Sequence, residues 1–435
     1  MLSRIRFDRK CVFAGLATMA AVLSLMPATA PARVASPEAT PTAIESVLYS
    51  FGVGPTGSVC TKADDGADPK GSLTYANGLL FGRTSTTTAQ GNGDGTIFQI
   101  MPDGSNYAVD YFFTGGKTDG ADPRHNAMTL VGSVLYGTTL AGGEHDNGTI
   151  FSINDDGSGY SSPPLFDFPK SASNNDGDQP HSCFVAGAGD LLYGMTSEGG
   201  KHGGTTGDGT IFSFDTSSGT YTRLHSFDGS HGADPHGQLI FDPNGTTLYG
   251  MTRAGGKDDV GVIFSFDTSS GKFKKLHDFS CPGNNTPDCV DKSNGATSDH
   301  GTLVQSGSTL FGLTTYGGKY GMGVIFSIHT NGGHFTILHH FGKTGTSDGQ
   351  NPYGSLLLSG TTLYGTTNAG GSKGNGTVFQ IDTSGKNYAR IYDFHNPPDG
   401  ANPIDNVILV GNTLYGMTEA GGLCGKGAIF AIQLP

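Results

Sequence analysis

Residues 361–394 read TTLYGTTNAGGSKGNGTVFQIDTSGKNYARIYDF, and this stretch recurs with variations along the whole chain. Residues 363–367 and 377–381 are rich in β-branched and aromatic residues, which favour strands. The glycine-rich loop between them supplies the positive φ angles that a hairpin needs. A second turn at 382–387 returns the chain into residues 388–394, which predicts an antiparallel meander. Because Val378 and Phe379 are adjacent and both apolar, the sheet must be covered on both faces, and we expect copies of itself to cover it.

The spacing of the repeat predicts the number of units. An aromatic residue followed by glycine recurs in steps of 55, 57, 56, 62, 53 and 51 residues, at Gly82, Gly137, Gly194, Gly250, Gly312, Gly365 and Gly416. Each unit also has a GTIF-like strand after the loop and an apolar strand before the aromatic-glycine pair. Four antiparallel strands in about 50 to 60 residues are typical of a propeller blade. The sequence therefore predicts an all-β fold, a seven-bladed β-propeller with four antiparallel strands per blade.

The two ends of the repeat region predict how the ring closes. The last unit stops at residues 431–435, directly after its third strand. Residues 45–51, ESVLYSF, match the fourth strand of another unit, residues 221–227, but no unit precedes them. If the N-terminal strand completes the last blade, both sheet edges at this point are paired. A straight β-solenoid or a pair of sandwiches is the alternative, and neither explains this permuted order.

The N-terminus has the pattern of a secretory signal. Basic residues are followed by an apolar run from Val12 to Met26 and by small residues suited to cleavage. We therefore expect a cleaved signal peptide at 1–32, a linker at 33–43 and a single propeller domain at 44–435. This predicts an exported protein that is periplasmic, extracellular or held at the cell surface. The apolar run is short for a membrane span and none follows it, so no span is expected in the mature chain.

Composition and charge limit the classes of binding partner that we expect. The formal net charge is −13 for the whole chain, and removal of the signal changes it to about −16, which disfavours a nucleic-acid partner. The 71 glycines occupy fixed places in the repeat, which indicates turn-dense β structure rather than low complexity. No nucleotide-binding, metalloprotease or hydrolase motif occurs in a suitable context, and no cofactor is expected.

The repeat as a whole, LYGTT…AGG…GxGTIF…LHxF…DGxxP, resembles the GloVer tandem repeat of secreted bacterial proteins over residues 45–435. A paired glycine after the second strand, as at Gly142-Gly143, also gives a loose likeness to Kelch units; the first unit departs with Gln90-Gly91. The resemblance implies an exported or surface-associated propeller. It carries no defined catalytic residues. Many such proteins have a C-terminal anchoring signal, whereas this chain ends on a blade strand.

The segments between units share a DGxxP pattern, as at residues 65–69, 119–123 and 399–403. Paired oxygen ligands around a glycine could form a calcium loop. Alternatively, Asp and Asn cap the turn and proline directs its exit into the next strand. We favour the structural turn, because later copies have only one carboxylate.

Just after this proline, the first residue of each inner strand is often basic. In a propeller these positions surround one mouth of the central channel. The residues at these positions that we consider candidates for ligand binding are Lys70, Arg124, His181, His236, His300 and Tyr353; the last unit has Ile404 there. The hypothesis is recognition of an anionic group such as a uronate or phosphate, or of a metal held by neighbouring histidines. The alternative is that long polar side chains fill a wet channel entrance, and we commit to no metal.

Five cysteines follow the predicted signal. Cys281 and Cys289 bracket a short polar insertion and are expected to pair. Cys60 and Cys424 lie on loops that a closed ring brings together, so a disulfide between them would join the two ends of the propeller; unpaired surface thiols are the alternative. Cys183, beside Phe184 at the start of an inner strand, is expected to be a buried free thiol.

Two function classes remain. The first is an exported non-catalytic binding or scaffold protein, a monomer that presents its loop-rich face to a glycan, a cell-envelope component or a protein. The second is a carbohydrate-active enzyme such as a polysaccharide lyase acting on a uronate-containing polymer, with Lys70 or Arg124 neutralising the carboxylate and a His or Tyr353 moving the proton. The regularity of the repeat favours the first.

Overall fold

The computed structural model describes residues 44–53, 60, 65–87, 93–125, 127–169, 176–202, 207–281, 294–343, 348–395 and 398–435. The predicted signal peptide and linker lie outside these residues. Within them the fold is an all-β propeller of seven four-stranded antiparallel sheets, with one 3-10 helix, η1 (Gly116–Thr118). No helix in this described part of the chain is long or apolar enough to cross a membrane.

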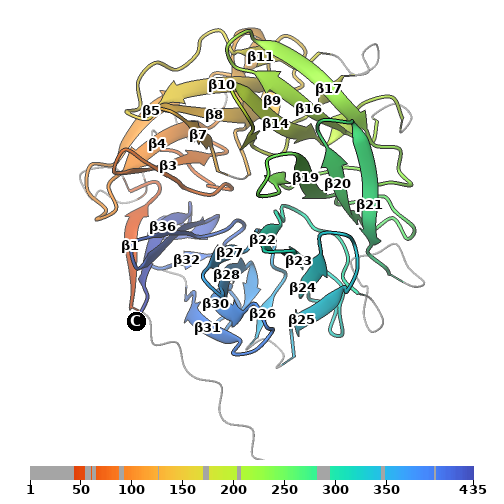
Figure 1. Cartoon of the computed structure of the whole chain (residues 1–435). Helices are drawn as coiled ribbons and strands as arrows, with labels where there is room; N and C mark the ends of the chain where they lie inside the picture. Colours follow the sequence, from red (N-terminus) through yellow and green to blue (C-terminus); the bar gives the residue numbers. More distant parts are fainter. Residues whose placement is uncertain are drawn as a thin grey trace, which may run out of the picture. The chain divides into compact units, whose positions relative to one another are not determined.

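Every blade has four strands, which are named below from the channel outward. Blades 1 to 3 are β2 (Thr74–Ala76), β3 (Leu79–Thr84), β4 (Thr96–Ile100) and β5 (Ala108–Phe112); β7 (Thr129–Val131), β8 (Val134–Thr139), β10 (Thr149–Asn154) and β11 (Phe166–Asp167); and β13 (Val185–Ala186), β14 (Leu191–Thr196), β16 (Thr210–Asp215) and β17 (Thr220–Ser226). Blades 4 and 5 are β18 (Ile240–Phe241), β19 (Thr247–Met251), β20 (Val262–Asp267) and β21 (Lys272–Asp278); and β22 (Val304–Ser306), β23 (Thr309–Thr314), β24 (Val324–His329) and β25 (Thr336–His340). Blades 6 and 7 are β27 (Leu357–Ser359), β28 (Thr362–Thr367), β30 (Thr377–Asp382) and β31 (Ala389–Asp393); and β33 (Ile408–Val410), β34 (Thr413–Thr418), β36 (Ala428–Gln433) and β1 (Ile44–Ser50). The blades follow one another around the ring in sequence order (Figure 1).

The glycine of each aromatic-glycine pair makes room for a phenylalanine. Gly137 on β8 lies opposite Phe151 on β10, and a Cβ on this glycine would come within 2.4 Å of the phenylalanine Cζ. The same pairing, with 2.3 to 2.7 Å, holds in all seven blades. The phenylalanines enter apolar clusters that each combine side chains of two neighbouring blades. The core of this protein therefore lies between the sheets.

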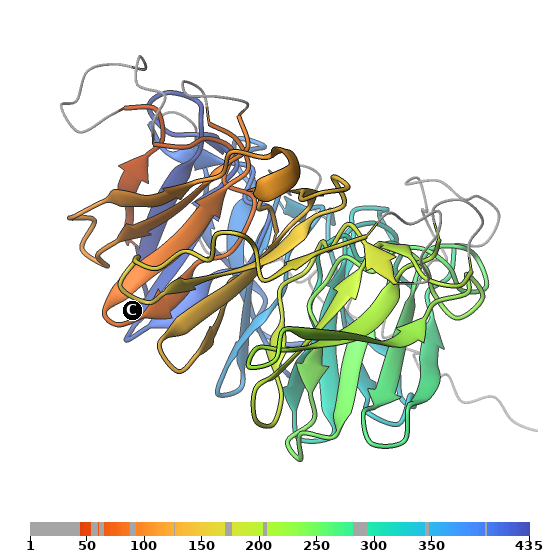
Figure 2. The same cartoon turned by 90° about the horizontal axis from the view of Figure 1, so that it is seen from above.

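The segments between blades, which we call connectors, lie on the same end of the ring as the loops between second and third strands. Four connectors form two-stranded sheets with these loops: β6 (Gly120–Ala121) with β9 (Ala141–Gly142), β12 (Gly177–Asp178) with β15 (Glu198–Gly199), β26 (Gly349–Gln350) with β29 (Ala369–Gly370), and β32 (Gly400–Ala401) with β35 (Ala420–Gly421). The other three make single bridges, which include Ala296 with Tyr316. Figure 2 shows the sheets turned by 90°, with loops at both ends of the strands. We call the end that carries the connectors the connector face.

One residue of each connector joins two blades through its backbone. Asp122, with φ of 56°, donates its N–H to the carbonyl of Asp94 in blade 1 and accepts the N–H of Leu140 in blade 2. Asp68 repeats this between Lys426 of blade 7 and Ser85 of blade 1. This backbone link between neighbouring blades is therefore also present between blades 7 and 1, where the two ends of the chain meet.

The first aspartate of the connector is a buried hydrogen-bond acceptor. Asp119 accepts from the hydroxyls of Tyr111 and Tyr160 at 2.9 Å each, from the backbone N–H of Thr114 at 2.8 Å and from that of Gly120 at 2.8 Å. The two tyrosine rings stack across the interface between blades 1 and 2 with centroids 3.4 Å apart. The hydrogen bonds of the Asp119 carboxylate are therefore made with tyrosine hydroxyls and backbone N–H groups, which is the arrangement of a structural turn.

The fourth-strand histidines take the same interblade position as these tyrosines. His225, His277 and His339 stack on Phe273, Phe335 and Tyr388 of the following blade, with centroids 3.7 to 4.3 Å apart. They are packing residues.

The N-terminal strand closes the ring, as the sequence predicts. β1 pairs antiparallel with β36 from Ile44 opposite Gln433 to Ser50 opposite Ala428, with one irregularity between Val47 and Tyr49. Strands from the two ends of the described chain thus lie side by side in one sheet (Figure 1).

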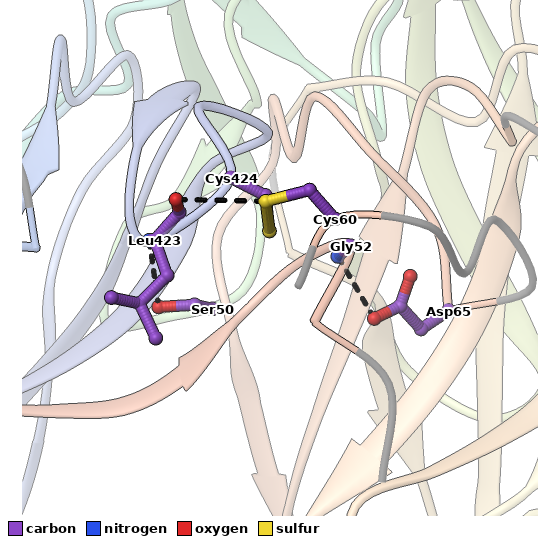
Figure 3. Close-up of a disulfide and its surroundings, with 6 residues drawn as sticks. All are labelled: Ser50, Gly52, Cys60, Asp65, Leu423 and Cys424. Carbon is purple, nitrogen blue, oxygen red and sulfur yellow. Dashed lines mark hydrogen bonds between the residues drawn. A yellow bond between two sulfur atoms is a disulfide. The ribbon is translucent and has the colours of Figure 1, made fainter. Parts of the chain in front are cut away.

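Cys60 and Cys424 form the predicted disulfide, with Cα atoms 5.2 Å apart. Figure 3 shows it near the hydrogen bonds from Leu423 N–H to Ser50 Oγ at 3.3 Å and from Gly52 N–H to Asp65 Oδ2 at 2.9 Å. Cys183 is a buried free thiol, also as predicted. Cys281 is disulfide-bonded, and Cys289, its expected partner, lies outside the described residues.

Candidate functional site

Four histidines meet at the axis of the ring, at the start of the inner segments. His125 stacks on His300 with ring centroids 3.8 Å apart, and His181 stacks on His236 at 3.9 Å. The two pairs lie side by side, with 5.6 Å from His125 to His181 and from His236 to His300. We call these four residues, from blades 2 to 5, the histidine layer. The sequence predicted three of them to be neighbours, and the structure adds His125.

His125 takes the inward place that the sequence analysis gave to Arg124. The core residue Met128 of blade 2 comes five positions after Pro123, whereas Phe184 of blade 3 comes four positions after Pro180. The extra residue is accommodated by a positive φ of 63° at His125. Arg124 then lies at the rim, where its Nη2 contacts Asp122 Oδ2. This one-residue difference in spacing is the signal that could have identified His125.

Burial keeps three of the four rings of the histidine layer uncharged. It lowers the pKa of His125, His181 and His300 well below that of a free histidine, and the neighbouring imidazoles lower it further. The Nδ1 atoms of these three rings are buried and, within the part of the chain that the structure describes, have no hydrogen-bond partner. At neutral pH these three rings are therefore neutral imidazoles and do not attract an anion through charge.

A buried arginine supports the layer from blade 1. Arg83 on β3 donates from Nη2 to the backbone carbonyl of His125 at 2.7 Å and from Nη1 to that of Thr138 at 3.0 Å. The same Nη2 lies 3.2 Å from Cys183 Sγ. Sequence reasoning missed this residue, although its position, directly after the aromatic-glycine pair, is Thr, Met or Leu in the other six blades.

Around the layer, the cationic side chains are held by carboxylates. Lys70 Nζ lies 3.1 Å from Glu419 Oε1. Arg253, which follows the second strand of blade 4, donates from Nη1 to Asp234 at 2.8 Å and from Nε to Asp299 at 2.7 Å. Burial alone would raise the pKa of Asp234, but hydrogen bonds from His236 and Arg253 hold it well below its ordinary value. The mouth is therefore a rim of ion pairs with little net positive charge.

Tyr353 completes the rim in blade 6. Its hydroxyl and that of Tyr316 are 3.1 Å apart, and its carbonyl accepts the N–H of His300 at 3.1 Å. Burial, followed by the neighbouring Tyr316, raises the pKa of Tyr353 above its ordinary value. Tyr353 is thus a neutral hydroxyl group rather than a base at neutral pH.

The arrangement does not resemble a metal site. Among the described residues, no group of three or more His, Cys, Asp or Glu side chains is placed to hold a metal ion. Within each face-to-face pair the imidazole planes are 4° to 15° from parallel, so their nitrogens do not converge on one point.

A cavity of about 530 Å³ lies in the channel on the inner side of the histidine layer. Its walls come from the inner segments of blades 4, 5 and 6, and Ala127 of blade 2 and Asn406 of blade 7 also line it. The residues of its wall nearest the layer, Gln238 and Thr302, are two positions after His236 and His300. This volume is in the range of small-molecule sites.

The fold and this axial site define a seven-bladed β-propeller repeat protein. The chain belongs to the Gloeobacter/Verrucomicrobia repeat family, whose repeat matches residues 44–203, 165–347 and 298–435. No curated protein matches the sequence.

Solved structures share the propeller fold at low identity. An oligogalacturonate lyase in complex with manganese is 11% identical with a TM-score of 0.55, over 92% of this chain and 95% of the lyase. A puromycin-hydrolyzing peptidase of Mycobacterium tuberculosis is 11% identical with a TM-score of 0.50, over 82% of this chain and 50% of the peptidase. At this identity the likeness concerns the fold alone.

Proposed function

We propose that the mature protein is an exported, non-catalytic glycan-binding protein that holds its ligand on the connector face, around the channel mouth. The observation that carries this proposal is the rim of ion pairs, in which Arg253 is fixed between Asp234 and Asp299 while its side chain stays 43% exposed. Fixed, exposed groups of this kind offer donors and acceptors side by side, which suits the hydroxyl pairs of a sugar. The Tyr316 and Tyr353 hydroxyls extend the same surface.

The geometry favours binding over lyase chemistry. A lyase acting on a uronate needs an accessible base and a positive group that neutralises the carboxylate. In this protein Lys70 is paired with Glu419, Arg124 is paired with Asp122, and His125 and His300 are less than a tenth exposed. The disulfide between Cys60 and Cys424 supports export, because such bonds persist in oxidising compartments.

The test is incubation of the purified mature protein with a panel of neutral and acidic polysaccharides, measuring both retention and the ultraviolet absorbance of new unsaturated ends. We expect retention by at least one polymer and no new ends. Arg253→Gln should weaken this retention at least fivefold. Lys272→Gln is the matched control, because it removes one positive charge from an exposed position at the start of outer strand β21. New unsaturated ends, or equal retention of both variants, would overturn the proposal.

A further inference from the structure

The channel cavity is a second candidate site, separate from the exposed rim. The histidine layer stands between it and the connector face, and the Ser355 hydroxyl on its wall lies 3.5 Å from the His300 carbonyl. It is lined by side chains of β18, β22, β27 and the segments that lead into them. A ligand in this cavity would touch none of the rim residues Lys70, Arg124 and Arg253.

The wall next to the histidine layer is polar and uncharged. We call its four side chains, one each from blades 4, 5, 6 and 7, the polar tier: Gln238, Thr302, Ser355 and Asn406. Backbone hydrogen bonds fix the hydroxyls, because Thr302 Oγ1 accepts from Gln238 N–H at 3.0 Å and Ser355 Oγ accepts from Thr302 N–H at 2.8 Å. The Asn406 amide oxygen accepts from the Ser72 hydroxyl across blades 7 and 1. Amides and hydroxyls have several donor and acceptor positions each, so the tier can also bind a ligand.

The next inward-facing positions are aliphatic. Along an inner strand the side chains alternate, so two residues beyond the polar tier lie Ile240, Val304 and Leu357, which we call the apolar tier. Among the described residues, those that line the cavity are all uncharged. The cavity is therefore amphipathic along its length, with hydrogen-bonding groups at the layer end and aliphatic groups beyond them.

We infer that the cavity binds a small uncharged amphiphile, with a hydroxyl or amide head in the polar tier and an aliphatic body against the apolar tier. A carboxylate or ammonium head would lose hydration without finding an opposite charge, which is unfavourable for an ion. A free sugar would leave the aliphatic groups without apolar contact. The cavity therefore favours a ligand with an uncharged polar head at one end and an aliphatic body at the other.

The experiment is isothermal titration calorimetry on the full mature protein with a series of matched eight-carbon probes. These are n-octyl β-glucoside below its critical micelle concentration, octanoate and octylammonium, with glucose as the head alone. We expect saturable binding of octyl glucoside, at least tenfold weaker binding of the two ions, and no measurable heat with glucose. No saturable heat with octyl glucoside, or equally tight binding of either ion, would overturn the inference.

Substitutions that fill the cavity with a larger side chain test the site, and the same substitution outside the cavity is the control. Val304→Phe puts a ring into the apolar tier and should reduce affinity for octyl glucoside at least tenfold. Val185→Phe makes the same change at the corresponding inner-strand position of blade 3, outside the cavity lining, and should change affinity less than twofold. Ile240→Phe is the second blocking variant if Val304→Phe does not fold. Full affinity in a folded blocking variant would overturn the site.

The two proposals fail independently. Arg253→Gln should leave octyl glucoside binding unchanged, and Val304→Phe should leave polysaccharide retention unchanged. Loss of both activities in both variants would contradict the separation of the two sites.

Discussion

Cys60 and Cys424 are bonded across 364 residues of chain, where the ends of the propeller meet. β1 is hydrogen-bonded to β36 along its length, and the disulfide joins the loop that follows β1 to the loop that precedes β36. The first residues of the described chain are therefore held in the last blade both by a sheet and by a covalent bond. A ring closed in this way has no unpaired outer strand at the seam.

We first predict that Cys60→Ser destabilises the protein by roughly 3 to 5 kcal/mol, because the bond restricts a very long loop of the unfolded chain. On typical per-residue unfolding entropies this lowers the melting temperature by about 5 °C in calorimetry. Cys424→Ser and the double variant should give the same loss, since each removes the same bond. A larger loss in the double variant, or a different partner of Cys60 in non-reducing peptide mapping, would contradict the pairing.

Second, a mature chain that begins at residue 53 should aggregate. Without β1 the backbone groups of β36 are exposed as a sheet edge that can pair with another molecule. A chain that begins at residue 42 retains β1 and is the control. Light scattering and size-exclusion chromatography decide it; a monomeric short chain with an unchanged melting temperature would contradict closure by β1.

Third, the histidine layer should make the protein sensitive to acid. The folded-state pKa values of His125, His181 and His300 are lowered, with burial as the main cause. The unfolded chain therefore binds protons first, and stability should fall as pH drops below about 6.5. Arg124, Arg253 and Asp234 face the layer. The pKa of Asp234 is lowered and that of Arg253 is raised, so these two groups stay charged in this range.

Urea unfolding at pH 7.5 and 5 measures this effect. His300→Gln should reduce the loss of stability between the two pH values, because one suppressed protonation is removed. His334→Gln, at an exposed turn of blade 5, should not change it. Equal acid sensitivity of the wild type and both variants would argue against the layer as the cause.

Fourth, a carboxyl group at the seam should have the opposite pH dependence. Burial, and then the nearby Asp399, raise the pKa of Glu45 on β1 to about 7. Its contribution is fully present below about pH 4.5 and is lost as pH rises through about 7, because the folded state then ionises a buried carboxyl. Glu45→Gln should therefore raise the melting temperature at pH 8 and leave it unchanged at pH 4. Exposed Glu144→Gln is the control; a stabilisation equal at both pH values would disprove the assignment.

Fifth, the connector aspartates should act through hydrogen bonds and not through calcium. Asp119→Ala leaves the Tyr111 and Tyr160 hydroxyls without their acceptor and should cost about 2 to 3 kcal/mol. Asp103→Ala, at an exposed turn, should cost much less. Calcium and a chelator should both leave the melting temperature of the wild type unchanged. A rise of several degrees with calcium would restore the alternative that the connectors bind this ion.

The sequence alone was sufficient for the architecture, because the relevant information is local and repeated. The Gly137–Phe151 contact and the turn at Asp119 recur in similar form from blade to blade, so the sequence of each unit predicts the same set of strands. The match of residues 45–51 to a fourth strand follows from counting, and it predicted both closure and the Cys60–Cys424 bond. A buried Cys183 followed from its place beside an apolar core residue.

Only the tertiary structure decided what stands at the axis. One extra residue after Pro123 turns His125 inward and leaves Arg124 at the rim, and Arg83 reaches from blade 1 to the carbonyl of His125. The basic residues that the sequence grouped as an anion site are paired with carboxylates or neutral through burial. The cavity depends on side chains more than 50 residues apart along the chain, such as Gln238 and Thr302, lining the same space. The period of the repeat places each residue within its own blade. Its contacts across the channel depend on residues that depart from the repeat in several blades at once, and no single repeat contains that information.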